Sequence, residues 1–374
     1  MVVSAHAELP RPAAATPDPQ AVRTFVHHAL ERARVLGRQL PPPGEGATGE
    51  LWRQLSALGR TDLAHARIIE PHLDALAILR QAGREDLAAG GHTWAVWAAE
   101  GPGEPLRAVP TADDAAGPGA GAPAGARAWT LTGTKPWCSL ADSVTRAVVT
   151  AHVCDENGEP TGHRRAFVVA TDHPGFEPEP VTRWISHGLA EVVTVPVAFD
   201  AVPAEPLGAD EWYLTRPGFA WGGMGVAAIW LGGAQSVADL LWSQLRHPRR
   251  PVDDAAFTAL GQLDLTLGAA RAVLERAAAA VDRGDAVGQR GAAWALRVRR
   301  TVADAAEEVI RVVSRATGPG PLTGDPGHIR RVESLQVYIR QDHAERDTAA
   351  LGRSLLELAE HTAQDSVQEE DTPW

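Results

Sequence analysis

The sequence predicts an α+β fold in which a helical N-terminal region precedes a central antiparallel β region and a C-terminal helical bundle. Two observations support this fold class. The spacing of apolar residues changes twice along the 374-residue chain, and the strand-like segments in its middle follow one another without helices between them. Consecutive strands flanked by helical blocks favour segregated α and β regions over a doubly wound parallel sheet.

The first block, residues 1–90, is predicted to be helical. In residues 21–40, apolar side chains recur at intervals of three and four, which places them on one face of a helix. Residues 50–60 and 71–83 repeat this pattern. We therefore expect an N-terminal domain of amphipathic helices.

The second block, residues 91–210, changes to short runs rich in Val, Thr, Phe and Trp. Gly, Pro and Asp separate these runs, as turns separate strands. The runs lie at residues 92–100, 126–138, 145–153, 164–171 and 192–203. Their order predicts an antiparallel β domain, either a barrel or a sandwich.

The third block, residues 211–374, returns to helical periodicity. Its long amphipathic segments lie at residues 225–245, 255–282, 292–316 and 330–360, and an acidic tail follows them. Several antiparallel helices of this length are typical of a bundle.

Composition narrows the class of protein. The chain has 35 basic and 47 acidic residues, a net charge of −12, which argues against a nucleic-acid partner. We see no secretory signal and no apolar run of the ~20 residues that a membrane span needs. Two cysteines, Cys138 and Cys154, cannot form a disulfide framework or a cysteine zinc site, so we expect no metal and a cytoplasmic location. Lys135 is the single lysine.

Three stretches carry a resemblance to a known family. They are AVWAAEGPG (95–103), LTGTKPWCSLAD (131–142) and VVTVPVAFDAVPAEPLG (192–208). With the order of the three blocks, they resemble the acyl-CoA dehydrogenase superfamily. That resemblance implies a β-barrel between a helical domain and a four-helix bundle, a flavin cofactor, and assembly as a homodimer or homotetramer.

The resemblance also implies which residues contact the flavin. Trp137 corresponds to a tryptophan that stacks near the isoalloxazine ring, and Ser139 to a residue whose hydroxyl points toward flavin N5, with the Cys138 backbone between them. The loop before Glu100 provides Trp97, Ala98 and Ala99 as further contacts, the two alanines through backbone groups. The alternative for Trp137 and Ser139 is a half-buried strand tryptophan and a turn residue.

The ADP half of the expected cofactor site is less well preserved. Arg246 is the counterpart of a family arginine that reaches the FAD of a neighbouring subunit, and Gly318 and Gly320 correspond to a family glycine loop. FAD is therefore the expected cofactor and FMN remains possible.

The customary catalytic glutamate is not found. The two family positions for this base fall near Val226 and Gln341, and neither side chain accepts a proton. Asp342 and His343 stand next to the second position and are the candidate catalytic residues. Asp342 would act as a base, and His343 would assist oxygen chemistry. Alternatively, the two side chains form ordinary i,i+4 pairs, with Arg346 and Asp347, on a solvated helix.

Three functions follow from these expectations. The first is a flavin-dependent oxidoreductase that acts on an acyl thioester or a related small molecule and passes electrons to a flavin-linked acceptor. The second is a monooxygenase of the same superfamily that uses oxygen through a flavin hydroperoxide. The third is a non-catalytic subunit that keeps the fold.

Overall fold

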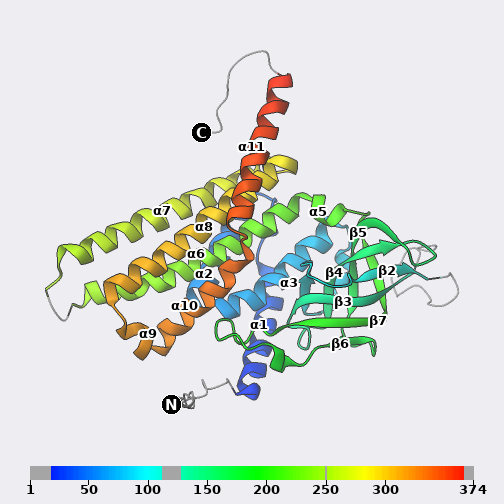
Figure 1. Ribbon diagram of the computed structural model, residues 1–374, viewed down its shortest axis with the longest axis horizontal. Helices are drawn as coiled ribbons and strands as arrows, with labels where there is room; N and C mark the ends of the chain where they lie inside the picture. Colours follow the sequence, from blue (N-terminus) through cyan, green and yellow to red (C-terminus); the bar gives the residue numbers. More distant parts are fainter. Residues whose placement is uncertain (1–17, 112–127, 249–250, 366–374) are drawn as a thin grey trace, which may run out of the picture.

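A computed structural model describes residues 18–111, 128–248 and 251–365 of the chain, with side chains as far as residue 360. Helices occupy both ends of the chain and strands its middle, as predicted (Figure 1). The acidic tail lies mainly outside the described residues. Whether the three sequence blocks are independent domains stays a prediction, because the main apolar core contains residues of all three.

The N-terminal helices are α1 (Pro19–Gln39), α2 (Thr48–Thr61), α3 (Leu63–Gln81) and the short α4 (Glu85–Ala88). The prediction placed the start of the third helix at Pro71, whereas α3 begins eight residues earlier and carries Pro71 in its interior. The reason is a local cap: the Asp62 carboxylate accepts a hydrogen bond of 2.9 Å from the backbone N–H of His65. The residues just before Pro71 therefore belong to a buried helix.

The strands are β1 (Trp94–Trp97), β2 (Arg107–Pro110), β3 (Trp129–Ser139), β4 (Arg146–Cys154), β5 (Pro160–Ala170), β6 (Phe176–Pro178) and β7 (Thr194–Leu207), with the 3-10 turn η1 (Val181–Arg183). Antiparallel pairs join β2 to β3, β3 to β7, β7 to β5, β5 to β4 and β6 to β7. Since β2 also pairs with β4, five of these strands follow one another in a circuit.

The prediction of a purely antiparallel sheet is wrong at β4. One edge of β4 pairs with β5, while the other pairs in parallel with β1 over residues 146–149 and with β2 over residues 152–153. The two short strands thus behave as one strand interrupted at residues 98–106. A segment that leaves the edge and rejoins it in the same direction gives parallel pairs without a helical crossover.

The C-terminal region consists of α5 (Trp212–Thr215), α6 (Pro217–Arg246), α7 (Asp254–Asp282), α8 (Gly288–Thr317), α9 (Gly320–Gly324), α10 (Pro326–Tyr338), the 3-10 turn η2 (Ile339–Gln341) and α11 (Glu345–Asp365). Helices α6, α7 and α8 pack along one another (Figure 1). By length and composition α6 would suffice to cross a membrane, but 83% of its apolar window is buried inside the protein.

The expected single helix over 330–360 is interrupted. Helix α10 ends at Tyr338, and α11 begins only at Glu345, after η2 and a residue with positive φ, Ala344 (φ 46°). This interruption matters because it carries the two predicted catalytic residues.

Helices α2 and α6 approach each other closely through glycines. A Cβ on Gly232 would lie 1.9 Å from the backbone oxygen of Ser56, and one on Gly59 would lie 2.4 Å from that of Ile229. Such distances leave no room for a side chain. This contact joins the N-terminal helices to the central helix of the C-terminal region.

We expect Gly232→Ala to lower the free energy of unfolding by about 1–3 kcal/mol, because the two helix backbones must separate to admit a methyl group. The control is Gly352→Ala on α11, where nothing lies within 4 Å of the added carbon. There alanine should stabilise by about 0.5–1 kcal/mol through helix propensity. Urea denaturation measures both, and equal midpoints for the two variants would contradict the packing.

Candidate active site

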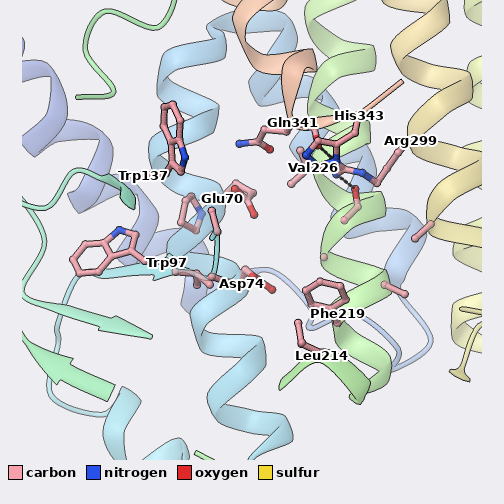
Figure 2. A pocket seen from close by; sticks show the side chains of 18 of the residues that line it. Glu70, Asp74, Trp97, Trp137, Leu214, Phe219, Val226, Arg299, Gln341 and His343 are labelled. Carbon is pink, nitrogen blue, oxygen red and sulfur yellow. Dashed lines mark hydrogen bonds between the residues drawn. The ribbon is translucent and has the colours of Figure 1, made fainter. Parts of the chain in front are cut away.

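A cavity of about 1250 Å³ lies between the β region and the helices. In Figure 2, Trp97 and Trp137 lie on one side of it, Val226, Arg299 and His343 on the other, with Glu70 and Asp74 of α3 between them. Its wall combines residues of β1, β3, α3, α6, α8 and the segment after α10. Residues from all three blocks of the chain therefore form one site.

Trp137 reaches the cavity through an irregularity in β3. The register of β3 against β7 shifts between Lys135 and Cys138, which marks a bulge. Within it Trp137 adopts a left-handed backbone (φ 59°) and keeps 59% of its surface exposed. A non-glycine residue in this conformation costs of order 1–3 kcal/mol and is typical of functional sites. The strand thus holds a flat, apolar ring at the cavity wall.

Ser139 lies at the end of the same strand and lines the cavity. Its hydroxyl is 2.9 Å from Thr194 Oγ1 and accepts a 3.4 Å hydrogen bond from Arg67 Nη2. The indole N–H of Trp97 donates to the Ser139 backbone oxygen at 3.0 Å. Ser139 is therefore fixed from two sides, while Trp97, 2% exposed, serves as a packed support for it.

The interrupted edge of β4 forms another part of the wall. Ala98, Ala99 and Glu100 leave the sheet and line the cavity, and the flavin contact expected of the two alanines stays a prediction. Lys135, 1% exposed, anchors this loop: its ammonium donates to Glu100 Oε1 at 2.9 Å and to Thr150 Oγ1 at 3.0 Å. The single lysine of the chain thus has a structural contact directly behind the loop.

Two carboxylates that the sequence analysis missed face the cavity from α3. The side chains of Glu70 and Asp74 are 13% and 20% exposed. Glu70 Oε2 lies 3.5 Å from Arg67 Nη1, and Asp74 Oδ1 lies 3.8 Å from Arg216 Nη2. Burial raises the pKa of Glu70 to about 7 despite the nearby Arg67, and burial likewise raises the pKa of Asp74.

Glu70 stands near the end of the site that holds Ser139. The Arg67 guanidinium contacts both the Glu70 carboxylate and the Ser139 hydroxyl, so the two side chains share one partner. Tyr338 also lines this part of the cavity, and its hydroxyl is buried without a hydrogen-bond partner among the described residues. The spacing of Arg67, Glu70 and Asp74 places them on one helix face and was the available signal.

Val226 and Gln341, the positions of the customary base, both line the cavity, so this part of the family alignment agrees with the geometry. His343 lines it as well, with its side chain 54% exposed and Nδ1 at 3.4 Å from Asp347 Oδ2, the i,i+4 pair that the sequence allowed.

Asp342 is placed differently from the expectation. Its carboxylate is not among the groups lining the cavity; it binds the Arg300 guanidinium and accepts a 2.9 Å hydrogen bond from the Ala344 N–H. The expected pair with Arg346 is absent from the described contacts, because the helix is interrupted at this residue. The geometry therefore gives no support to Asp342 as a base.

The remaining cofactor candidates lie outside this cavity. The Cys138 thiol points to the Lys135 carbonyl oxygen in the core, and burial raises its pKa. Arg246 lies at the end of α6 with its guanidinium over the Trp242 ring. Gly318 follows α8 and Gly320 begins α9. The cavity thus brings together the residues expected around the isoalloxazine ring, except Cys138. The residues expected around the ADP half of the cofactor lie elsewhere in the chain.

No protein-family model matches the sequence, and no curated protein is similar to it at a significant level. Solved structures share the fold over nearly the whole chain. Glutaryl-CoA dehydrogenase from Mycobacterium smegmatis is 18% identical with a TM-score of 0.70, covering 92% of this chain and 95% of that one. KijD3, in complex with FMN and dTDP-3-amino-2,3,6-trideoxy-4-keto-3-methyl-D-glucose, is 20% identical with a TM-score of 0.68, covering 91% and 94%. FMN-bound dibenzothiophene monooxygenase (TdsC) from Paenibacillus sp. A11-2 is 15% identical with a TM-score of 0.68, covering 90% and 97%.

The raised pKa of Glu70 predicts a pH-dependent stability. The native carboxyl keeps its proton up to a pH of about 7, whereas the unfolded one loses it near 4.5, so wild-type stability falls as pH rises between these values. Relative to Glu70→Gln, the wild type should lose about 1–3 kcal/mol between pH 4.5 and pH 8. Urea unfolding across this range measures the difference. Glu275→Gln, on the exposed face of α7, keeps Glu70 and should show the same pH dependence of stability as the wild type.

Proposed function

The chain has the acyl-CoA dehydrogenase fold that its motifs predict, and on that premise we propose that it is a flavin-dependent oxidoreductase acting on a small molecule in the cavity. The observation that carries this proposal is Trp137. A protein that holds a tryptophan in a strained conformation, exposed at a cavity wall, places a flat apolar surface where an isoalloxazine ring needs one.

The residues of the cavity fit a flavin in their chemistry. Trp137 would stack on the ring system, the Ser139 hydroxyl would face its polar edge, and the backbone of Ala98 and Ala99 would supply further polar contacts. A bound flavin exchanges electrons with a substrate. FAD and FMN share the ring that these residues would contact, so the mass of the released cofactor distinguishes them.

We assign proton transfer to Glu70. It replaces the glutamate missing from Val226 and Gln341, faces the same cavity, and lies next to Ser139 through their shared partner Arg67. A carboxyl with a pKa near 7 is suited to accept or donate a proton at neutral pH. Arg67 would hold it in position.

A second candidate is an oxygen-dependent monooxygenase. The observation in its favour is that both customary base positions hold side chains without a titratable group, while His343 stands at the edge of the cavity. Product formation that requires oxygen and a supply of reduced flavin would favour this function over dehydrogenation of an acyl thioester.

Four further expectations remain proposals. The circuit of strands is proposed to be the β-barrel of the fold, and α6, α7, α8 and α10 its four-helix bundle. Phe257 and Leu265 of α7 are 57% and 75% exposed, which supports a homodimer or homotetramer joined through the helical region. The two cysteines are free and buried, as suits a reducing cytoplasm.

Flavin binding is the direct test of the proposed function. The purified protein should carry or take up a flavin with a shifted absorbance spectrum. Trp137→Ala should weaken flavin binding about tenfold or more by removing the stacking surface, while Trp137→Phe should retain most of it. Fluorescence titration measures both affinities. A protein that binds neither FAD nor FMN would contradict the proposal and support the non-catalytic alternative.

Glu70→Gln should lower turnover about 100- to 10,000-fold while flavin binding is retained, because the amide cannot transfer the proton. The assay is single-turnover flavin reduction by a panel of acyl thioesters, and oxygen-coupled product formation for the alternative reaction. In the wild type the rate should change around pH 7, and this inflection should disappear in the variant. Glu275→Gln is the matched control, and equal rates for both variants would remove Glu70 from the mechanism.

A further inference from the structure

The charged side chains that line the cavity have partners, with one exception. Outside the centre, Glu100 pairs with Lys135, Arg340 with Glu307, and Asp347 with His343. At the centre, Arg67 lies beside Glu70 and Arg216 beside Asp74. For Arg299, no carboxylate oxygen of the described residues lies within 4.0 Å, and its attraction to Glu70, Asp342 and Asp347 acts over longer distances. Among the described residues of the cavity, Arg299 is therefore the charged side chain without an ion-pair partner within 4.0 Å.

Arg299 is held rigidly in place. Its Nη1 donates to the backbone oxygen of Gly223 at 3.1 Å, its Nη2 donates to that of Gln341 at 2.6 Å, and its carbon Cζ lies 4.7 Å from the centre of the Trp230 ring. A Cβ on Gly223 would lie 3.4 Å from Arg299 Cδ, an ordinary contact distance, so the Arg299 side chain lies directly against this part of α6. A guanidinium has five N–H donors, and these two bonds leave three without a partner in the described chain.

The position of Arg299 indicates what its free donors meet. It lies across the cavity from Trp137, on the same side as Val226 and His343 (Figure 2). Trp137 marks the proposed flavin face, so the guanidinium stands on the far side of the space in which a substrate would lie. A partly buried cation with free donors is stabilised by an anion, and a carboxylate matches its planar donor geometry.

We propose that Arg299 binds a carboxylate of the substrate, so that the enzyme acts on small organic acids rather than on amines or neutral compounds. This inference rests on the proposed flavin-dependent function only in calling the bound acid a substrate. Three guanidiniums and two carboxylates surround the centre of the cavity, so positive charge is in excess there and a negative charge on the substrate reduces that excess.

The experiment is calorimetric titration of the flavin-loaded protein with acetate, benzoate and indole-3-acetate, each compared with its neutral amide, and with benzylamine as the cationic probe. At least one acid should bind about 10- to 100-fold more tightly than its amide, the range expected for a charge-assisted hydrogen-bonded pair. In Arg299→Gln this preference should disappear while the affinity for the amide is unchanged. Arg299→Lys should keep part of it, and Arg340→Gln, at the exposed edge, should keep all of it.

Three results would overturn the inference: binding of none of the acids, binding of amides or benzylamine as tightly as the acids, or an Arg299→Gln protein that loses flavin affinity and keeps the preference. The last result would assign the guanidinium to the flavin phosphate. Repeating the titration without flavin separates this inference from the proposed function. A protein that binds no flavin but still prefers acids supports the anion site and contradicts the proposed flavin chemistry. A flavoprotein without the preference supports the flavin chemistry and contradicts the anion site.

Discussion

The bulge of β3 between Lys135 and Cys138 is the constraint on which the geometry of the site depends. Side chains of a regular strand alternate between its two faces, so Lys135, Trp137 and Ser139 would all lie on one side. Lys135 and Ser139 are buried, whereas the bulge leaves Trp137 exposed at the wall of the cavity, which Ser139 also lines. Because Lys135 holds the loop at Glu100 and Ser139 is bound by Trp97, the same short segment places most of the expected isoalloxazine contacts.

The part of the wall between the two sides of the cavity depends on the electrostatics of α3. Its carboxylates stand within 4 Å of guanidiniums, but at distances too long for short, strong ion pairs, and both lose much of their hydration. Desolvation therefore outweighs the attraction, and both carboxyls retain protons more tightly than they would in water. A molecule that fills the cavity would displace further water and increase this effect. The protonation of Glu70 and Asp74 therefore depends on what is bound in the cavity.

The sequence was sufficient for the order of the three regions, because apolar periodicity reports directly which face of an element is buried. It also located Trp137 and Ser139, whose motif is local. It did not locate Glu70, because Pro71 resembles the first residue of a helix and the Asp62 cap that moves this start lies nine residues before Pro71. Arg299 was missed for another reason: it stands in an arginine-rich helix beside Arg297 and Arg300, which are also half-buried, and only the tertiary contacts distinguish the three. The placement of Asp342 was likewise missed because its carboxylate binds Arg300, a contact between distant segments.

Because Lys135 is buried, its chemical reactivity can be used to measure local opening of the cavity wall. It is the single lysine of the sequence, and its ammonium is enclosed between Glu100 and Thr150 behind the wall of the cavity. A reagent that acylates primary amines reaches this side chain only when the loop at residues 98–106 separates from the sheet. The rate of modification at this one position therefore follows how often the cofactor wall opens, and a ligand that holds the wall closed would slow it.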